Sequence, residues 1–329
     1  MKILITGGTG FIGSRLALDR LEKGDFVRVL GQANTVAEAE NRGLIESKGA
    51  RVLLGSVTEK EKVDEAVKDI DVVFHLAAAQ HEANVPDQRF WDVNVTGTKN
   101  LLEAGVRAKV KRFVHGSTIG VYGSAREGVL DEKSSLKPDN IYGVTKLEAE
   151  KTVRAFEGQI PWVIIRISET YGPGDQRLLK LFKAIKKKAF FMIGQGENWH
   201  HPIYIDDLIA GLDLGAVSEK AVGGTFVLAG REPVTTRQMV EEISSALGVS
   251  VTRFSAPLAP FVILAAAMET FLRPIGIQPP LHRRRLDFFR KNFSFSIEEA
   301  IRRLGFDPRT GFRQGVEKTL RWYSEIGAM

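Results

Sequence analysis

The chain has 329 residues, a formal net charge of +6 at pH 7 and no cysteine. This length can bury a large core, in one large domain or in two joined ones, and the lack of cysteine excludes disulfides, thiolate zinc sites and cysteine nucleophiles. No signal peptide precedes the first expected strand, so the chain is expected in the cytoplasm, and no zinc-finger or RNA-binding aromatic signature supports a nucleic-acid partner.

The first stretch of the chain predicts a dinucleotide site. Residues 2–5 are apolar, as in a buried parallel strand, and run into the loop TGGTGFIG of residues 6–13 and then an amphipathic helix. In such a unit Gly7 permits the tight turn, Gly10 leaves room for the pyrophosphate, and Gly13 lets the helix pack close to the strand. Free N–H groups at the helix start bind the phosphates. The alternative is a glycine-rich turn without a ligand, and the flanking strand and helix favour the ligand.

The end of the second strand bears on the choice between NAD and NADP. Residues 26–30 are expected to form this strand, and an acidic residue at its end would hydrogen-bond the ribose 2′-hydroxyl of NAD. Here the strand is followed by Gly31 and Gln32, so no carboxylate repels a 2′-phosphate. Arg28 and Arg51 are candidates to bind one. The cofactor is therefore expected to be NAD or NADP, with NADP favoured.

Strands and helices then alternate along the chain. Helices are expected over residues 36–47, 59–68 and 85–108 and from residues 138–139 onward, and strands over residues 51–54, 71–74, 112–115 and 161–167. This alternation predicts an α/β fold with a doubly wound, mostly parallel Rossmann sheet, whose ligands bind at the carboxyl ends of the strands. Ser56, residues 77–79, Ser117-Thr118 and Ser168 all fall at such ends. His75 closes an apolar strand and is expected to be structural.

The helix that follows residue 138 carries Tyr142 and Lys146. Residues at this spacing share one face of a helix and can reach one ligand. A tyrosine in water has a pKa of about 10, and a nearby cation favours the phenolate. Such a pair also occurs on ordinary helix surfaces. The glycine loop and the hydroxyls of Ser117 and Thr118 favour a proton-transfer site.

After Ile167 the alternation fades, which predicts a Rossmann domain over residues 1–170 and a smaller, partly interleaved substrate-binding region over residues 171–329. A helix near 205–217 and a strand near 225–228 are candidates to join the Rossmann core. Helices are also expected over 178–188 and 235–247; Asp206 or Asp207 should cap the 205–217 helix, and Thr235 or Thr236 the 235–247 helix.

Residues 257–271 are unusually apolar. The run is too short for a membrane-spanning helix, which needs about 20 apolar residues, and Pro260 interrupts it. A buried helix or a substrate lid is expected. The next stretch, residues 274–285, ends in three arginines and could lay the protein on an anionic membrane. The alternative is that residues 257–281 form a lid and a surface helix follows.

Taken together, these motifs resemble the extended short-chain dehydrogenase/reductase family, which includes NAD-dependent epimerase/dehydratases and 3β-hydroxysteroid-dehydrogenase-like reductases. The likeness covers nearly the whole chain and rests on the glycine loop, His75-Leu76-Ala77-Ala78, Asn94 before Gly97-Thr98, Ser117-Thr118 before Val121-Tyr122-Gly123, Tyr142 with Lys146, Arg166 before Tyr171-Gly172-Pro173-Gly174, and Tyr204-Ile205-Asp206-Asp207. It implies a homodimer formed through the helices near 85–108 and 138–157. No metal is expected.

By this resemblance Tyr142 is the catalytic acid/base. Lys146 would bind the nicotinamide ribose and lower the pKa of the tyrosine, Thr118 would steady the substrate oxygen, and Ser117 could substitute for Thr118. The loop, the strand ends and the resemblance place the cofactor against Gly7, Gly10, Phe11, Ile12, Gly13, Gln32, Ser56, Val57, Leu76, Ala77, Ala78, Asn94, Tyr142, Lys146 and Ile167.

Departures from the family pattern narrow the substrate. The Asp-Glu pair of sugar-nucleotide 4,6-dehydratases is Ile119-Gly120 here, so dehydration lacks its acid and base. The asparagine with which many epimerases contact a diphosphate sugar is Glu169, whose charge would repel it, and the usual adenine-contacting acid is Ser56. We therefore expect an NAD(P)-dependent oxidoreductase that interconverts a secondary alcohol and a ketone on an apolar, sterol-like or lipid-like substrate. The alternative is a sugar-nucleotide epimerase that retains NAD. A third possibility is a non-catalytic nucleotide sensor. Such a protein would need the glycine loop but not Tyr142, so the presence of this tyrosine argues against it.

Overall fold

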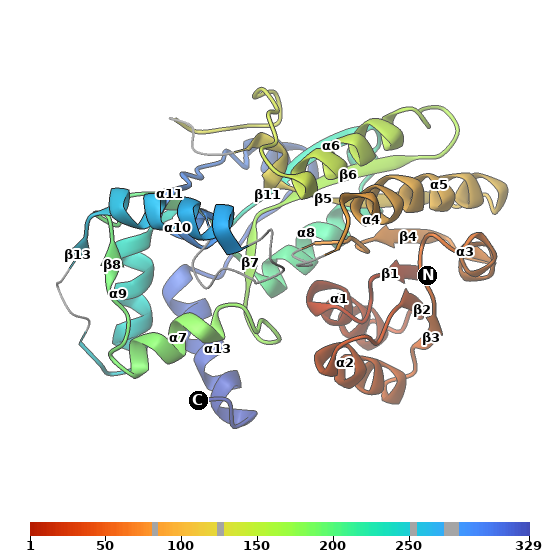
Figure 1. Ribbon diagram of the computed structural model, residues 1–329. Coiled ribbons are helices and arrows are strands. Elements are labelled where there is room, and N and C mark those ends of the chain that lie inside the picture. Colours follow the sequence, from red (N-terminus) through yellow and green to blue (C-terminus); the bar gives the residue numbers. More distant parts are fainter. Residues whose placement is uncertain (81–84, 124–127, 251–254, 273–282) are drawn as a thin grey trace.

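Seven parallel strands form the centre of the molecule (Figure 1). The computed structural model describes residues 1–80, 85–123, 128–250, 255–272 and 283–329. The strand order is β11-β6-β5-β4-β1-β2-β3, and every neighbouring pair is parallel. The strands are β1 (Lys2–Thr6), β2 (Phe26–Gly31), β3 (Arg51–Leu54), β4 (Val72–His75), β5 (Arg112–Thr118), β6 (Trp162–Ile167) and β11 (Gly224–Leu228). The predicted α/β doubly wound sheet is confirmed, and the strand expected near 225–228 is its edge strand β11.

Helices cover both faces of this sheet because its strands are apolar on both sides. Ile3 and Ile5 of β1 pack into one core, with residues of α1 and α8, while Leu4 packs into the other, with residues of α3 and α5. The helices are α1 (Phe11–Glu22), α2 (Val36–Ser47), α3 (Lys60–Val67), α5 (Gly97–Arg107), α6 (Ile141–Arg154) and α8 (Ile205–Val217). This layering directs all seven carboxyl ends to one edge of the sheet.

The helix expected over 85–108 is interrupted by a π-helical turn. It comprises α4 (Asp87–Trp91), the π turn Asp92–Thr96 and α5. Single π turns inside α-helices are rare, so the sequence was interpreted as one continuous helix. Pro86 sets the start of α4.

One expected helix start and one expected helix cap are wrong. The helix with Tyr142 begins at Ile141 rather than near 138–139, because the Asn140 side chain accepts the Gly143 N–H at 3.0 Å and caps it. Helix α8 has no aspartate cap. Its Asp207 instead accepts the backbone N–H groups of Arg309 and Thr310, at 3.1 and 2.9 Å. That aspartate therefore ties the C-terminal segment to the sheet domain.

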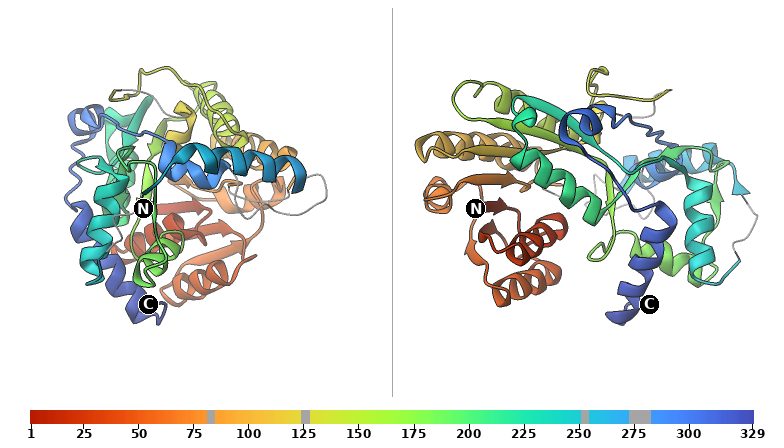
Figure 2. Two further views of the ribbon diagram at one scale, coloured as in Figure 1. Left: turned by 60° about the vertical axis from the view of Figure 1, so that its left-hand side comes forward. Right: turned by 180° about the vertical axis from the view of Figure 1, so that it is seen from behind.

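The remaining elements lie toward the end of the sheet formed by β6 and β11, away from α2 and α3 (Figures 1 and 2). Three short strand pairs join β10 (Pro202–Tyr204) to β7 (Glu169–Tyr171), β12 (Val234–Thr235) to β9 (Trp199–His200), and β13 (Ser255–Ala256) to β8 (Met192–Ile193). The helices are α7 (Leu179–Lys186), α9 (Thr236–Ala246), α10 (Leu258–Leu272), α11 (Arg283–Arg290), α12 (Glu298–Leu304) and α13 (Phe312–Glu325). Of the two threonines considered as the cap of α9, Thr235 is the one that caps it.

The apolar run at 257–271 forms helix α10. Within the described ranges, no helix has the length and apolar character needed to cross a membrane. Residues 274–282 and the side chains of Arg283–Arg285 lie outside the description, so the membrane contact expected for 274–285 is not assessed there. The division of the chain at residue 170 and the homodimer stay predictions.

Candidate active site

A cavity of about 1030 Å³ opens at the carboxyl ends of the strands and runs from the glycine loop to α11. Of the residues predicted for the site, eleven line it: Gly7, Gly10, Phe11, Ile12, Gly13, Leu76, Ala78, Ser117, Thr118, Tyr142 and Ile167. The others do not line it: Gln32, Ser56, Val57, Ala77, Asn94 and Lys146. The cavity thus brings the glycine loop and the hydroxyl groups together, whereas Lys146 and Asn94 lie behind its wall.

The glycine loop is shaped by close backbone contacts. Gly7 has a φ of +69°, and a Cβ on it would lie 2.8 Å from the Ala77 nitrogen. A Cβ on Gly13 would lie 2.3 Å from the Gly7 carbonyl oxygen. Helix α1 follows Gly10 without a side-chain cap, so its first N–H groups remain available to an anion. The loop therefore fits the diphosphate of a dinucleotide.

We expect Gly13→Ala to weaken NADH binding by about tenfold or more, ~1.4 kcal/mol, because the new Cβ forces the loop apart. Fluorescence titration of NADH measures this change. The matched control is Gly43→Ala in α2, where a Cβ meets no heavy atom within 4 Å. Equal affinities of the two variants would contradict the role of the loop.

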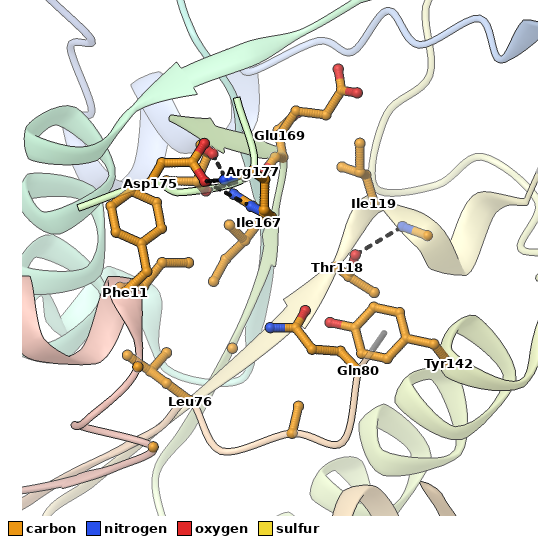
Figure 3. A pocket seen from close by; sticks show the side chains of 18 of the residues that line it. Phe11, Leu76, Gln80, Thr118, Ile119, Tyr142, Ile167, Glu169, Asp175 and Arg177 are labelled. Carbon is orange, nitrogen blue, oxygen red and sulfur yellow. Dashed lines mark hydrogen bonds and ion pairs between the residues drawn. The ribbon is translucent and has the colours of Figure 1, made fainter. Parts of the chain in front are cut away.

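Tyr142 and Thr118 form the chemical centre of the cavity (Figure 3). Both side chains line the cavity, and Thr118 Oγ1 accepts the Gly120 N–H at 3.1 Å. Burial raises the pKa of Tyr142 to about 12, against the opposing effects of the Thr118 hydroxyl and the Arg177 charge. Tyr142 therefore holds its proton at neutral pH and can act as an acid.

Lys146 is fully enclosed beside this pair. Its Nζ lies 3.4 Å from His115 Nε2, and burial lowers the pKa of the amine to about 8, although the nearby Glu150 raises it. The positive charge that favours the Tyr142 phenolate comes from Arg177. The amino group of Lys146 turns toward His115, and its effect on the pKa of the phenol stays a prediction.

Ser117 lines the cavity, but its hydroxyl belongs to a buried ion-pair network. Its hydroxyl donates to Glu150 Oε1 at 2.6 Å. Arg166 binds the same carboxylate with two N–H groups, at 3.0 and 2.8 Å, and donates to the Tyr122 hydroxyl at 2.8 Å. Since Ser117 is engaged in this way, Thr118 is the better candidate to act with Tyr142.

Asn94 and His75 hold the backbone rather than face the cavity. The π turn directs Asn94 so that its Oδ1 accepts the Ala79 N–H at 2.8 Å and its Nδ2 donates to Thr145 at 2.9 Å. His75 bonds two threonine hydroxyls at 2.8 Å, which agrees with a structural role. The end of β4 is thereby fixed against α6.

The opposite wall carries an ion pair that sequence reasoning missed. Glu169 Oε1 lies 3.0 Å from His200 Nδ1, and His200 Nε2 lies 3.0 Å from the Phe288 carbonyl oxygen. Burial lowers the pKa of His200, but the charge and hydrogen bond of Glu169 outweigh it and raise the pKa above its ordinary value. Because both ring nitrogens face oxygen acceptors, the geometry suits the imidazolium. The sequence signal was the pair of histidines at 200–201, to which no partner could be assigned.

Arg177 is a second residue that was missed. It donates to Asp175 Oδ1 at 3.0 Å and to the Thr170 carbonyl at 2.7 Å, and its guanidinium lies 5.9 Å from the centre of the Phe11 ring. Figure 3 shows these groups together on the wall across from Tyr142. Arg177 thus places a positive charge between the glycine loop and the chemical centre.

At the N-terminus of α2, the cavity is lined by a carboxylate rather than by an arginine. Arg28 donates to the carbonyls of Ala66 and Lys68, at 2.9 and 2.7 Å, and Arg51 stacks on Phe26. Neither arginine lines the cavity. Glu38 does line it, at the N-terminus of α2. The two arginines therefore give no support to a 2′-phosphate.

Comparison with known proteins places this geometry in a family. The chain matches the model of the "NAD dependent epimerase/dehydratase family" over residues 3–229. The "Low-salt glycan biosynthesis protein Agl12" of Haloferax volcanii is 31% identical over 76% of this chain and 84% of its own length. The "3 beta-hydroxysteroid dehydrogenase/Delta 5-->4-isomerase" of Mycobacterium tuberculosis is 30% identical over 99% of this chain and 91% of its own length. The crystal structure of UDP-glucuronic acid 4-epimerase from Bacillus cereus in complex with NAD is 25% identical, with a TM-score of 0.79 and 99% of both chains covered.

The chain therefore belongs to the NAD-dependent epimerase/dehydratase family of extended short-chain dehydrogenase/reductases. The resemblance inferred from the motifs is confirmed, and the chain is an NAD-dependent oxidoreductase-type enzyme. These relatives include a steroid dehydrogenase and a sugar-nucleotide epimerase, so membership leaves the substrate open.

Proposed function

We propose that the protein is an NAD(P)-dependent oxidoreductase that interconverts a secondary alcohol and a ketone on an apolar, sterol-like or lipid-like substrate. The observation that carries the proposal is that Tyr142 and Thr118 line the same cavity as the glycine loop. The full-length similarity to a steroid dehydrogenase supports it.

The residues act on one oxygen atom of the substrate. When bound, the nicotinamide supplies the hydride chemistry. Tyr142 gives its proton to a carbonyl oxygen during reduction, or takes the proton of an alcohol during oxidation. The Thr118 hydroxyl donates a hydrogen bond to the same oxygen and so orients it. Lys146 would hold the ribose side of the cofactor once its amino group turns from His115 toward the cavity, and Asn94 fixes the backbone at the end of β4.

The cavity wall supports an apolar substrate over a diphosphate. Ile119, Ile167 and Phe293 line the cavity near the chemical centre. Glu169 lines the same wall, and its charge is held by His200, which lowers the carboxyl pKa although burial raises it. A diphosphate at this wall would meet a stable negative charge.

Parallel assays with two substrate classes test the proposal. We expect a 3β-hydroxysteroid with NAD, or a sterol ketone with NADH, to change the absorbance of the reduced nicotinamide. UDP-glucuronic acid should give neither this change nor an epimer. Turnover of the sugar nucleotide without turnover of the sterol would overturn the proposal.

The second candidate is a sugar-nucleotide epimerase. Arg290 and Lys291 line the outer part of the cavity, where cations could bind a diphosphate. However, Lys291 Nζ lies 3.5 Å from both Asp139 and Asp287, which reduces its charge toward a ligand. Purification with tightly bound NAD, and turnover of a UDP-sugar without release of NADH, would favour this candidate.

For the cofactor, we expect NAD to bind at least about tenfold more tightly than NADP, because a 2′-phosphate would approach the carboxylate of Glu38. This reverses the preference drawn from the end of β2. Glu38→Gln should narrow the ratio of the two dissociation constants and still cap α2, since glutamine also completes a capping box. Isothermal titration with both cofactors measures the ratio, and tighter binding of NADP to the natural protein would contradict the expectation.

A further inference from the structure

We propose that α10 lies flat on the surface of an anionic lipid bilayer. This proposal does not depend on the identity of the substrate. The helix has no charged side chain between Leu258 and Met268. At a rise of about 1.5 Å per residue it is roughly 22 Å long, so it suits the interface of a bilayer rather than its full thickness.

The two faces of α10 have different surroundings. Phe261, Val262 and Ala265 face the protein and pack with Ile193 and with Leu286 and Phe289 of α11. The opposite face carries Ile263, Leu264 and Phe271, whose exposed fractions are 70%, 52% and 73%. At helical spacing these three side chains share one face, so they form a continuous apolar strip that points away from the protein.

A further exposed aromatic side chain lies next to α10. Phe191, which is 40% exposed, has its ring 6.0 Å from that of Phe261, on the face of α10 that is turned toward the protein. Figure 1 shows α10 at the upper left of the molecule, and the left view of Figure 2 shows it in front of the other elements. Large exposed apolar side chains grouped in this way mark an interaction surface.

Basic charge on a neighbouring segment favours an anionic membrane as the partner. Lys186 ends α7, and Lys187 and Lys188 follow it, three to four residues before the Phe191 side chain that contacts α10. All three lysines are exposed. An exposed apolar helix face with lysines on a neighbouring segment is a pattern of interfacial binding to negatively charged lipid. The net charge of +6 acts in the same direction.

The proposed membrane contact also adjoins the cavity. Glu269 of α10 lines the cavity and lies two residues before the exposed Phe271. One helix therefore borders the bilayer on one face and the substrate cavity near its C-terminal end. An apolar ligand dissolved in the bilayer would reach the cavity without crossing open water.

Sedimentation of the full chain with lipid vesicles tests the proposal. We expect binding to vesicles of phosphatidylcholine with phosphatidylglycerol, and much less binding to phosphatidylcholine alone. Ile263→Glu/Phe271→Glu should lower binding by about tenfold or more, because two exposed apolar side chains no longer enter the lipid. Lys186→Gln/Lys187→Gln/Lys188→Gln should lower it by roughly fivefold per lysine and abolish the preference for the anionic lipid.

The matched control is Val36→Glu on α2, which removes an apolar side chain of 76% exposure from a different helix. It should bind vesicles like the natural protein. Near-ultraviolet circular dichroism checks that each variant is folded. Equal binding by the Ile263/Phe271 variant and the natural protein would overturn the proposal. A second outcome would also overturn it: the natural protein does not bind vesicles but forms a dimer, and the Ile263/Phe271 variant dissociates this dimer. The exposed face of α10 would then contact a second copy of the chain.

Discussion

Tyr142→Phe is expected to lower kcat for ketone reduction by about 10³-fold, within the range of 10² to 10⁴ for loss of a general acid. The phenol hydroxyl is the proton donor that faces the cavity, and phenylalanine keeps the ring that packs there. Steady-state kinetics with NADH and the ketone measure the loss.

The affinity of Tyr142→Phe for NADH should stay close to that of the natural protein, because the substitution does not change the glycine loop. Tyr204→Phe is the matched control, because that tyrosine is buried outside the cavity. A Tyr142→Phe enzyme with the natural kcat would assign the proton transfer to another group.

The pH dependence follows from the same tyrosine. A phenol with a pKa of about 12 stays protonated through the neutral range, so it serves reduction directly. Oxidation of the alcohol requires the phenolate, whose fraction increases as pH rises. The oxidation rate of the natural enzyme should therefore rise with pH, while the residual rate of Tyr142→Phe should lack this dependence on the phenol.

The parts of the site that are local in sequence were predictable. Gly7, Gly10 and Gly13 lie in one loop between a strand and a helix, and the pattern of apolar residues places that unit in a parallel sheet. Tyr142 and Thr118 were found by matching motifs on neighbouring elements, and the structure brings their hydroxyls together.

What could not be predicted depends on contacts between distant segments. The sequence led us to expect that Glu169 repels a diphosphate. It did not predict the ion pair with His200, because that histidine lies on another strand. The role of Asp207 was misjudged for the same reason. Its carboxylate binds the backbone N–H groups of Arg309 and Thr310, which are distant in sequence, and does not cap its own helix. The direction of the Lys146 amino group toward His115 likewise follows only from packing.

Arg166→Met is expected to destabilise the folded protein by about 3–5 kcal/mol at neutral pH. Arg166 and Glu150 are both buried, and their bidentate ion pair keeps the pKa of Glu150 below its ordinary value, although burial raises it. Methionine fills much of the volume of the arginine but leaves the Glu150 carboxylate without its counter-charge. The hydrogen bond from Ser117 to Glu150 cannot replace that charge. Urea unfolding followed by circular dichroism measures the loss.

Two further variants separate charge from packing. Arg154 contacts the same carboxylate at 3.4 Å, but its side chain is 42% exposed, so Arg154→Met should cost less than about 1 kcal/mol. Adding Glu150→Gln to Arg166→Met should recover much of the stability, because no unpaired charge remains buried. An equal loss in Arg154→Met and Arg166→Met would contradict this account.

The sign of the pH dependence distinguishes the ion pair from a simple packing defect. In the natural protein, the depressed pKa of Glu150 gives stability that is present above its unfolded value of about 4.3 and is lost as pH falls through the folded value. In Arg166→Met the unpaired carboxyl favours its neutral form, so its folded pKa should exceed the unfolded one. The stability gap between the two proteins should therefore narrow as the pH is lowered toward that range. A gap that stays constant with pH would mean that Arg166 stabilises the fold by packing alone.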